Sequence, residues 1–139
     1  FTHYLFETYR LLGAADALFE RLQLWFDLPA QGFTTTPEQP EPSRSDCHGW
    51  GAHPYFHCFA TLLGIRPTAP GFAQVEITPL PGPLGTVEGA LVHPRGTITV
   101  QLRHENGALR GSIALPDGVS GTLRIGGESR PLAAGSTTF

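Results

Sequence analysis

The chain is 139 residues long, with 40% hydrophobic and 15% charged residues, a composition typical of globular proteins. Nine arginines and twelve carboxylates leave a formal charge of -3. Because the cations are few and scattered, neither a nucleic acid nor an acidic membrane surface is an expected partner. A single folded body of this length buries roughly 68% of its extended surface, whereas each of two equal lobes buries only about 61%.

Membrane-spanning and disulfide-rich classes are also disfavoured. No apolar run approaches the roughly 18 to 20 residues of a membrane helix, and the start of the chain lacks the order of a signal peptide. We therefore expect a soluble protein. Cys47 and Cys58 are too few for a disulfide scaffold and are predicted to be small buried side chains. Because the chain starts at Phe1, already within an apolar pattern, we expect a fragment of a longer protein.

Residues 1–64 have the periodicity of helices. Apolar side chains recur at helical spacing at Phe1, Leu5, Tyr9 and Leu12. Gly13 then predicts a helix end, because glycine adopts the left-handed cap conformation without steric cost. A second helix is predicted over residues 14–28, with a wide apolar side that indicates more than one packing neighbour. A third is predicted over residues 54–63, since proline suits a first helical position.

Residues 65–139 alternate between apolar and polar side chains, as strands do. Five strands are predicted over residues 74–78, 86–92, 97–103, 109–115 and 121–125. Asn106-Gly107 predicts a tight hairpin between two of them, because both residues tolerate positive φ. Strands of this length and spacing are typical of an antiparallel β-sandwich. The predicted fold class is therefore α+β.

The connection between the second and third predicted helices has no apolar periodicity and concentrates reactive groups. Residues 34–54 carry three carboxylates, two histidines, an arginine and a tryptophan. Such a mixture suits acid-base chemistry on a polar ligand, with an aromatic face available to a sugar or a base. Loops are normally polar, however, so composition favours this interpretation no more than a solvated connection with Trp50 filling the core beneath it.

The spacing disfavours a metal site and a cysteine nucleophile. His53 and His57 are four residues apart and lie near two cysteines, but the set matches no standard zinc template. His53 also precedes Pro54, and the residue before a proline is pushed away from helical geometry. Cys47 and His48 are adjacent, and adjacent side chains rarely point at each other. We therefore expect no metal and no cofactor, and supporting or structural roles for His53 and His57.

Two runs of the sequence are distinctive. They are SRSDCHGWGAHP, residues 43–54, and LGIRPTAPGF, residues 63–72. Together they resemble the carboxy-terminal part of bacterial α-L-rhamnosidases of glycoside hydrolase family 78. The resemblance implies that residues 1–64 are the last helices of an (α/α)6 six-hairpin toroid, the catalytic domain. It implies that residues 65–139 are the antiparallel, jelly-roll-like β-sandwich that follows the toroid.

The same resemblance implies a glycosidase that releases terminal α-L-rhamnose with inversion, using two carboxyl groups. In such enzymes a threonine-rich loop after a long barrel helix carries the glutamate regarded as the general base. Here residues 34–36 are threonines and Glu38 follows them, so Glu38 is the candidate base. Many relatives have tryptophan directly before this glutamate, whereas this chain has Pro37. Glu41 is therefore kept as the alternative register.

Substrate-binding roles are implied for two neighbouring residues. His48 matches a histidine that in relatives faces the bound sugar, although a structural role at the helix start is the competing interpretation. Trp50 either stacks on the sugar or packs between helices. Arg44 and Asp46 are expected to form a local salt bridge or cap. In similar enzymes the general acid lies earlier in the barrel, so the isolated chain is expected to be inactive.

The expected partners are rhamnosylated glycosides or oligosaccharides and the rest of the parent barrel. Helices built to pack on both sides also predict self-association of the fragment. Two alternatives stay open: a six-hairpin glycosidase of other sugar specificity, because fold does not set specificity, and a non-catalytic carbohydrate-binding or structural β-sandwich module. The sequence does not distinguish the bacterial cytoplasm from export as the cellular location.

Overall fold

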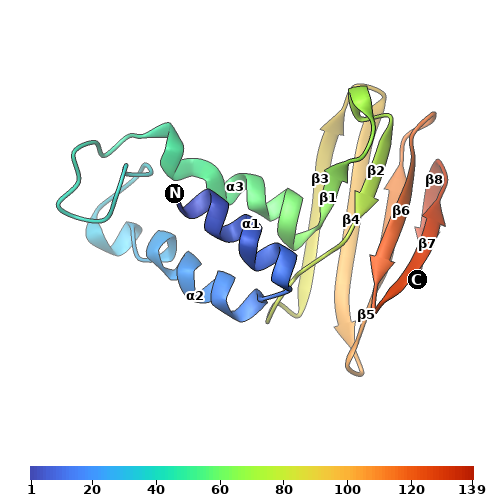
Figure 1. Ribbon diagram of the computed structural model, residues 1–139, viewed down its shortest axis with the longest axis horizontal. Coiled ribbons are helices and arrows are strands. Elements are labelled where there is room, and N and C mark those ends of the chain that lie inside the picture. The colour runs from blue at the N-terminus through green and yellow to red at the C-terminus, as the bar shows by residue number, and fades with distance from the viewer. The chain divides into compact units, whose positions relative to one another are not determined.

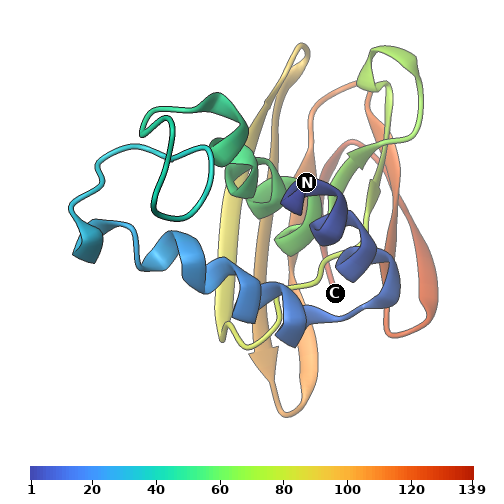
Figure 2. The same cartoon turned by 60° about the vertical axis from the view of Figure 1, so that its left-hand side comes forward.

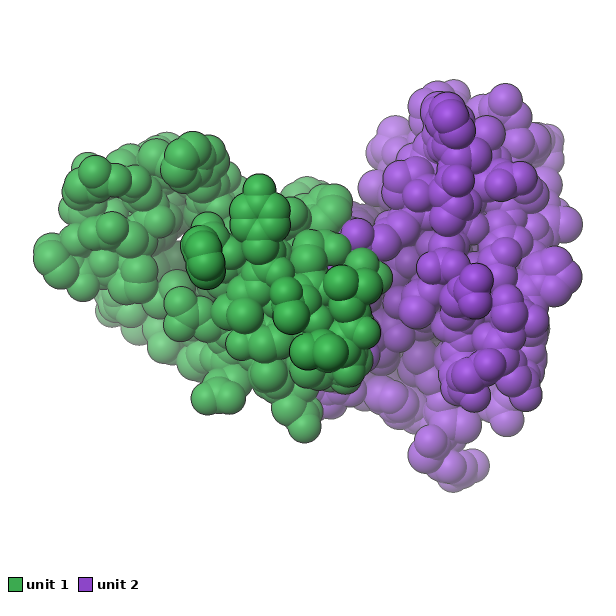
Figure 3. All heavy atoms as spheres, viewed as in Figure 1, with its two compact units in different colours: residues 1–58 green, residues 59–139 purple.

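The computed structural model describes residues 1–139, which divide into two structural units (Figures 1 and 3). Unit 1, residues 1–58, holds helices and the long polar loop, and unit 2, residues 59–139, holds two β-sheets. No helix combines the length and the apolar character that crossing a bilayer requires. The α+β class predicted from the sequence is confirmed.

The first two helices of unit 1 form a helical hairpin (Figure 2). They are α1 (Thr2–Leu12) and α2 (Ala15–Phe26), as the apolar periodicity predicted. Gly13 ends α1 in the left-handed conformation, with φ 65° and ψ 21°, and its N–H donates to Arg10 O. Phe6 of α1 and Leu18 of α2 are completely or almost completely buried. Leu18 belongs to the apolar side predicted for the second helix. In α1 the buried residue is Phe6, which the predicted stripe did not include, whereas Phe1 and Leu12 of that stripe are exposed.

The third helical segment follows the long loop. Its parts are the 3-10 helix η2 (Gly49–Ala52), α3 (His53–His57) and the π-helical stretch η3 (Cys58–Leu62). Another 3-10 helix, η1 (Pro29–Gln31), lies before the loop. The prediction that Pro54 displaces His53 from helical geometry is wrong, because His53 has φ -57° and ψ -25°. The His53 ring packs edge-on against Phe6 and Trp25, with centroids 5.1 Å apart in both pairs. This packing outweighs the local preference before a proline.

Unit 2 is a sandwich of two four-stranded sheets. One has the order β1-β2-β6-β7, built from β1 (Ile65–Pro67), β2 (Gln74–Ile77), β6 (Ser120–Ile125) and β7 (Glu128–Leu132). The other has the order β3-β4-β5-β8, built from β3 (Thr86–His93), β4 (Gly96–Glu105), β5 (Ala108–Leu115) and β8 (Gly135–Thr138). A 3-10 turn, η4 (Pro70–Phe72), joins β1 to β2.

The five predicted strands are all present, and three short strands were missed. The missed strands β1, β7 and β8 are three to five residues long and do not alternate clearly: β7 is exposed at four of its five residues, and β8 has no buried residue. The purely antiparallel prediction needs one correction, because β2 and β6 pair in parallel. The chain between them crosses to the other sheet to form β3, β4 and β5, and this crossover lets β6 return in the direction of β2.

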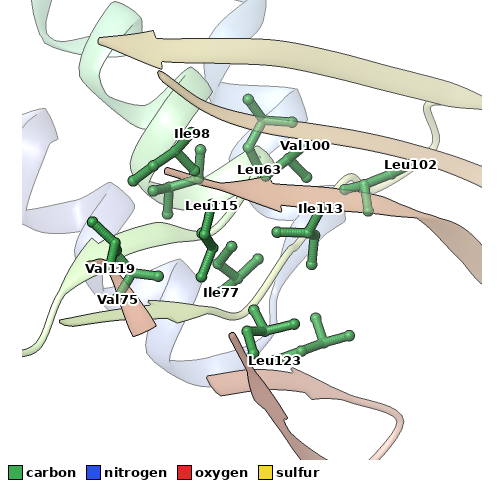
Figure 4. Packing of buried hydrophobic residues seen from close by; sticks show 12 residues of the cluster. Leu63, Val75, Ile77, Ile98, Val100, Leu102, Ile113, Leu115, Val119 and Leu123 are labelled. Atoms are coloured by element: carbon green, nitrogen blue, oxygen red, sulfur yellow. The ribbon is translucent and has the colours of Figure 1, made fainter. Parts of the chain in front are cut away.

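The core of unit 2 is built by alternating side chains from both sheets (Figure 4). Ile98, Val100 and Leu102 of β4 are buried, while the residues between them are more accessible. Leu123 of β6 faces them from the other sheet and is fully buried. The hairpin predicted at Asn106-Gly107 joins β4 to β5, with φ values of 50° and 78°. Period-two alternation therefore determined which residues form this core.

We expect Leu123→Ala to lower the free energy of unfolding of unit 2 by about 2–5 kcal/mol, because it leaves a cavity in a dry, close-packed core. Val92→Ala is the matched control. Val92 is 86% exposed in the neighbouring sheet, so its truncation should change stability by about 0.5 kcal/mol or less. Urea denaturation followed by circular dichroism measures both variants. Equal effects of the two substitutions would contradict the assignment of Leu123 to the core.

Candidate active site

The long loop of unit 1 folds back on itself through backbone hydrogen bonds. The His48 N–H donates to Thr36 O at 2.8 Å, and the Glu38 N–H donates to Ser45 O at 2.8 Å. The Thr36 hydroxyl also donates to His48 O at 3.2 Å. These bonds satisfy polar backbone groups and align two loop segments as a short antiparallel pair. The loop thereby gives Glu38 a defined position.

The segment that follows the loop is anchored to α2. The indole Nε1–H of Trp25 donates to Gly51 O at 2.7 Å, and Gly51 is buried. This bond joins the 3-10 helix η2 to the second helix. As a result Trp50, the residue before Gly51, is carried on a fixed turn although its own side chain is 80% exposed.

Glu38 and Glu41, the two candidate bases, have different surroundings. The Glu38 side chain is only 17% exposed and accepts a hydrogen bond from the guanidinium of Arg44. Glu41 is exposed, and its Oε2 accepts from the Ser43 N–H at 2.9 Å. The expected pair between Arg44 and Asp46 is wrong: the turn between Glu38 and Arg44 brings the guanidinium to Glu38.

A hollow of about 110 Å³ lies beside the loop within unit 1. Glu38 and Trp50 both line it, together with Arg21 of α2, Trp25 and His53. Glu41 is not among its lining residues. The structure therefore brings Glu38 and Trp50 to the same hollow, and it combines a carboxylate, a cation and two indoles there.

His48 does not line the hollow, but its ring contacts Trp50, which does. The two rings are in edge-to-face contact, with centroids 5.2 Å apart and planes at 78°. The backbone of His48 serves the loop pairing and precedes η2, and its side chain is half-buried. The residue is thus fixed at both its backbone and its ring.

One cluster of titratable groups was missed by the sequence analysis. His3 Nδ1 lies 3.0 Å from His57 Nε2, although the residues are 54 positions apart in the chain. His53 completes the cluster, and burial is the main cause that lowers its pKa to about 4, with His3 and the N-terminal amine adding to the effect. No local pattern signals a contact across so much sequence.

The cysteine prediction is wrong, since both cysteines are free and exposed. Cys47 lies in the exposed part of the long loop, and Cys58 lies where α3 passes into the π-helical stretch. Small size and apolar character favour burial only where the segment itself faces a core. Neither segment directs its cysteine side chain toward a core.

One family model matches the chain. The model described as the bacterial alpha-L-rhamnosidase C-terminal domain matches residues 64–139, more than half of the chain. Comparison with curated proteins gave no match.

Among solved structures, an α-L-rhamnosidase from Streptomyces avermitilis complexed with L-rhamnose is similar at 18% identity and a TM-score of 0.59, over 71% of this chain and 12% of that one. The native α-L-rhamnosidase from Aspergillus terreus matches at 19% identity and a TM-score of 0.68, over 83% of this chain and 15% of that one. The α-L-rhamnosidase from Dictyoglumus thermophilum matches at 16% identity and a TM-score of 0.68, over 81% of this chain and 16% of that one.

These matches fix the fold and the scale of the relationship. At identities below 20% the solved structures share the α+β fold, and the chain spans only 12% to 16% of their length. The family match stands on residues 64–139, which are the sandwich together with the glycine before it. The chain belongs to the family of bacterial α-L-rhamnosidase C-terminal domains.

Proposed function

We propose that this chain is the carboxy-terminal part of an inverting glycosidase that releases terminal α-L-rhamnose, with Glu38 as its general base. The observation that carries the proposal is the position of Glu38. Its carboxylate is largely shielded and lines a hollow together with an exposed indole. Glu41 points its carboxylate back to its own loop. This contrast favours the Glu38 register over the alternative.

The mechanism needs two carboxyl groups on opposite sides of the sugar. A carboxylic acid protonates the leaving oxygen while a carboxylate removes a proton from the attacking water, and the two groups are about 6.5 to 9.5 Å apart. Glu38 takes the second role. The general acid belongs to the earlier part of the parent barrel, so the 139-residue chain alone is inactive. No metal is needed for these two proton transfers.

Arg44 orients the proposed base. Its guanidinium donates to Oε1 of Glu38, which holds the carboxylate in one direction. The Arg44 side chain is itself 76% exposed, so the ion pair adds little to stability. The ion pair instead positions the Glu38 carboxylate, because a general base must lie at hydrogen-bond distance from the water that it deprotonates.

His48 and Trp50 form the proposed sugar-binding surface. The exposed Trp50 indole offers a flat apolar face, which suits the hydrophobic side of a deoxy sugar. The His48 ring, in edge-to-face contact with that indole, supplies a hydrogen-bonding group for a hydroxyl. Both residues are held by the same turn, so the two contacts are set together.

Residues 1–64 are proposed to be the last helices of the catalytic domain, and the rest of the parent barrel is their proposed partner. Residues 65–139 are then the sandwich domain. Tyr4, Leu11 and Leu12 of α1 are 72%, 73% and 75% exposed. Apolar residues so exposed on one helix support the proposal that a further helix of the parent protein covers them. The solved rhamnosidases cover 81% and 83% of this chain, beyond the sandwich alone. Without its barrel, the fragment self-associates through these residues.

A second candidate function is carbohydrate binding by the sandwich. A shallow site of about 460 Å³ on the β3-β4-β5 face is lined by polar and charged side chains, among them Gln101, Arg103 and Arg110. Such groups can bind sugar hydroxyls. Calorimetric titration of the chain with rhamnosides separates the candidates. If Arg110→Ala abolishes binding and Trp50→Ala leaves it unchanged, the result supports sugar binding by the sandwich.

We expect Glu38→Gln, made in the complete protein that carries this chain, to lower turnover of an aryl α-L-rhamnoside by about 10²- to 10⁴-fold. The amide keeps the size of the side chain but accepts no proton from water. Glu41→Gln is the matched control and should retain turnover within about threefold, because Glu41 lies outside the hollow. Steady-state kinetics measures both variants. Near-normal turnover of Glu38→Gln excludes it as the base.

We also expect Gly51→Ala to displace the loop segment that carries Glu38. A methyl group at Gly51 would lie 2.4 Å from Pro37 O and 2.9 Å from Thr36 Cβ. Since a shift of about 1 Å can cost about 10²-fold in rate, turnover of the complete protein should fall by that order. Gly49→Ala, where nothing lies within 4 Å, should leave turnover unchanged. Equal rates for the two variants would show that Glu38 does not depend on this contact.

A further inference from the structure

Three histidines of unit 1 converge from two neighbouring helices. His3 lies in the first turn of α1, and His53 and His57 lie four residues apart on α3, which is in contact with α1 (Figure 1). One ligand atom from each histidine lies within 4.8 Å of those of the other two. Imidazole nitrogen is the commonest metal ligand in proteins. The cluster therefore has the composition of a metal site.

The closest pair in the cluster is at hydrogen-bond distance, slightly closer than two ligands of one zinc ion. His3 Nδ1 and His57 Nε2 are 3.0 Å apart. A tetrahedral zinc ion with bonds of about 2.0–2.1 Å sets neighbouring ligand nitrogens roughly 3.3 Å apart. Neutral imidazole carries one N–H and one lone pair, so two facing lone pairs at this distance need a proton or a cation between them. For a divalent cation to replace the shared proton, the two nitrogens must move apart by roughly 0.3 Å.

Glu7 places a carboxylate beside His57, the kind of group that metal-binding histidines use as an outer partner. Its Oε1 lies 3.9 Å from His57 Nδ1, on the side of the ring away from His3. Arg10 holds the same carboxylate at 3.3 Å through Oε2. A proton on His57 Nδ1, directed toward Glu7, leaves Nε2 with its lone pair toward His3. This tautomer is the one that a metal ion requires.

His53 has the unsatisfied atom that an incomplete site leaves behind. Its Nδ1 is buried and has no hydrogen-bond partner in the structure. Burying a polar nitrogen without a partner costs free energy, so such atoms call for an explanation. A metal ion bound by the cluster would give this nitrogen a partner.

Aromatic rings pack against the cluster, while His3 and His53 stay partly accessible to water. The ring of Phe6, which is fully buried, lies 5.1 Å from the rings of both His53 and His57. Phe56 packs edge-on against His3 at 5.6 Å. An apolar shell of this kind strengthens the interaction between a cation and its ligands.

From these contacts we infer that His3, His53 and His57 bind one Zn²⁺, with Glu7 as the outer carboxylate and water in the fourth position. The ion has a structural role, because it ties the first turn of α1 to α3. It does not take part in the two-carboxylate chemistry. His53 is the one ligand that also lines the hollow beside Glu38, and the binding test below needs no enzyme activity, so failure of the inference is distinguishable from failure of the proposed function. The earlier expectation of no metal considered only His53, His57 and residues near them in sequence, and tertiary structure adds His3.

The test uses the purified 139-residue chain after removal of metals with a chelator. Calorimetric titration with ZnCl₂ should give one Zn²⁺ per chain, and the melting temperature should rise with Zn²⁺ concentration. His3→Ala should weaken binding by roughly tenfold or more. His104→Ala is the matched control, because it removes an exposed histidine of β4 outside the cluster and should keep the affinity. Circular dichroism verifies that both variants fold.

Histidine-ring NMR of the unsubstituted chain gives a readout that needs no variant. Zn²⁺ should shift the ring nitrogen signals of His3, His53 and His57 and leave that of His104 unchanged. Co²⁺ in place of Zn²⁺ should give the intense visible bands of a tetrahedral site. Absence of binding, equal affinity of His3→Ala and the unsubstituted chain, or ring shifts confined to other histidines would each overturn the inference.

Discussion

The pairing of the two loop segments around Thr36 and His48 is the constraint on which the candidate active site depends. Two backbone hydrogen bonds, from His48 to Thr36 and from Glu38 to Ser45, turn a long polar connection into a fixed structure. Ordering such a loop costs conformational entropy for each residue, and satisfied backbone groups offset that cost. Because Trp25 holds Gly51 at the end of the same loop, the carboxylate and the exposed indole reach one hollow.

The sandwich shows a different balance between local pattern and long-range order. Alternation of apolar residues identified the five main strands and most of the core, since every second side chain of a strand faces the same side. The parallel pairing of β2 with β6 followed no local signal. Strand direction in that sheet depends on the three strands between them, which belong to the other sheet.

The helical unit illustrates how packing overrides local rules. The residue before Pro54 was expected outside helical geometry, yet His53 is helical because Phe6 and Trp25 enclose its ring. Arg44 was expected near Asp46, but the turn of the loop presents it to Glu38. In both cases the deciding neighbour comes from a contact that sequence spacing alone does not specify, as is usual for loops and helix starts.

The sequence by itself determined the α+β class, the ends of the main helices, the strands with clear alternation and, through its resemblance to α-L-rhamnosidases, Glu38, His48 and Trp50 as candidate site residues. Period and turn chemistry are local properties, so they can be recognised without coordinates. Only the tertiary structure placed Glu38 in a hollow from which Glu41 is absent, and only it brought His3 to His57. Those contacts join residues far apart in the chain, and the packing of whole helices and loops decides them.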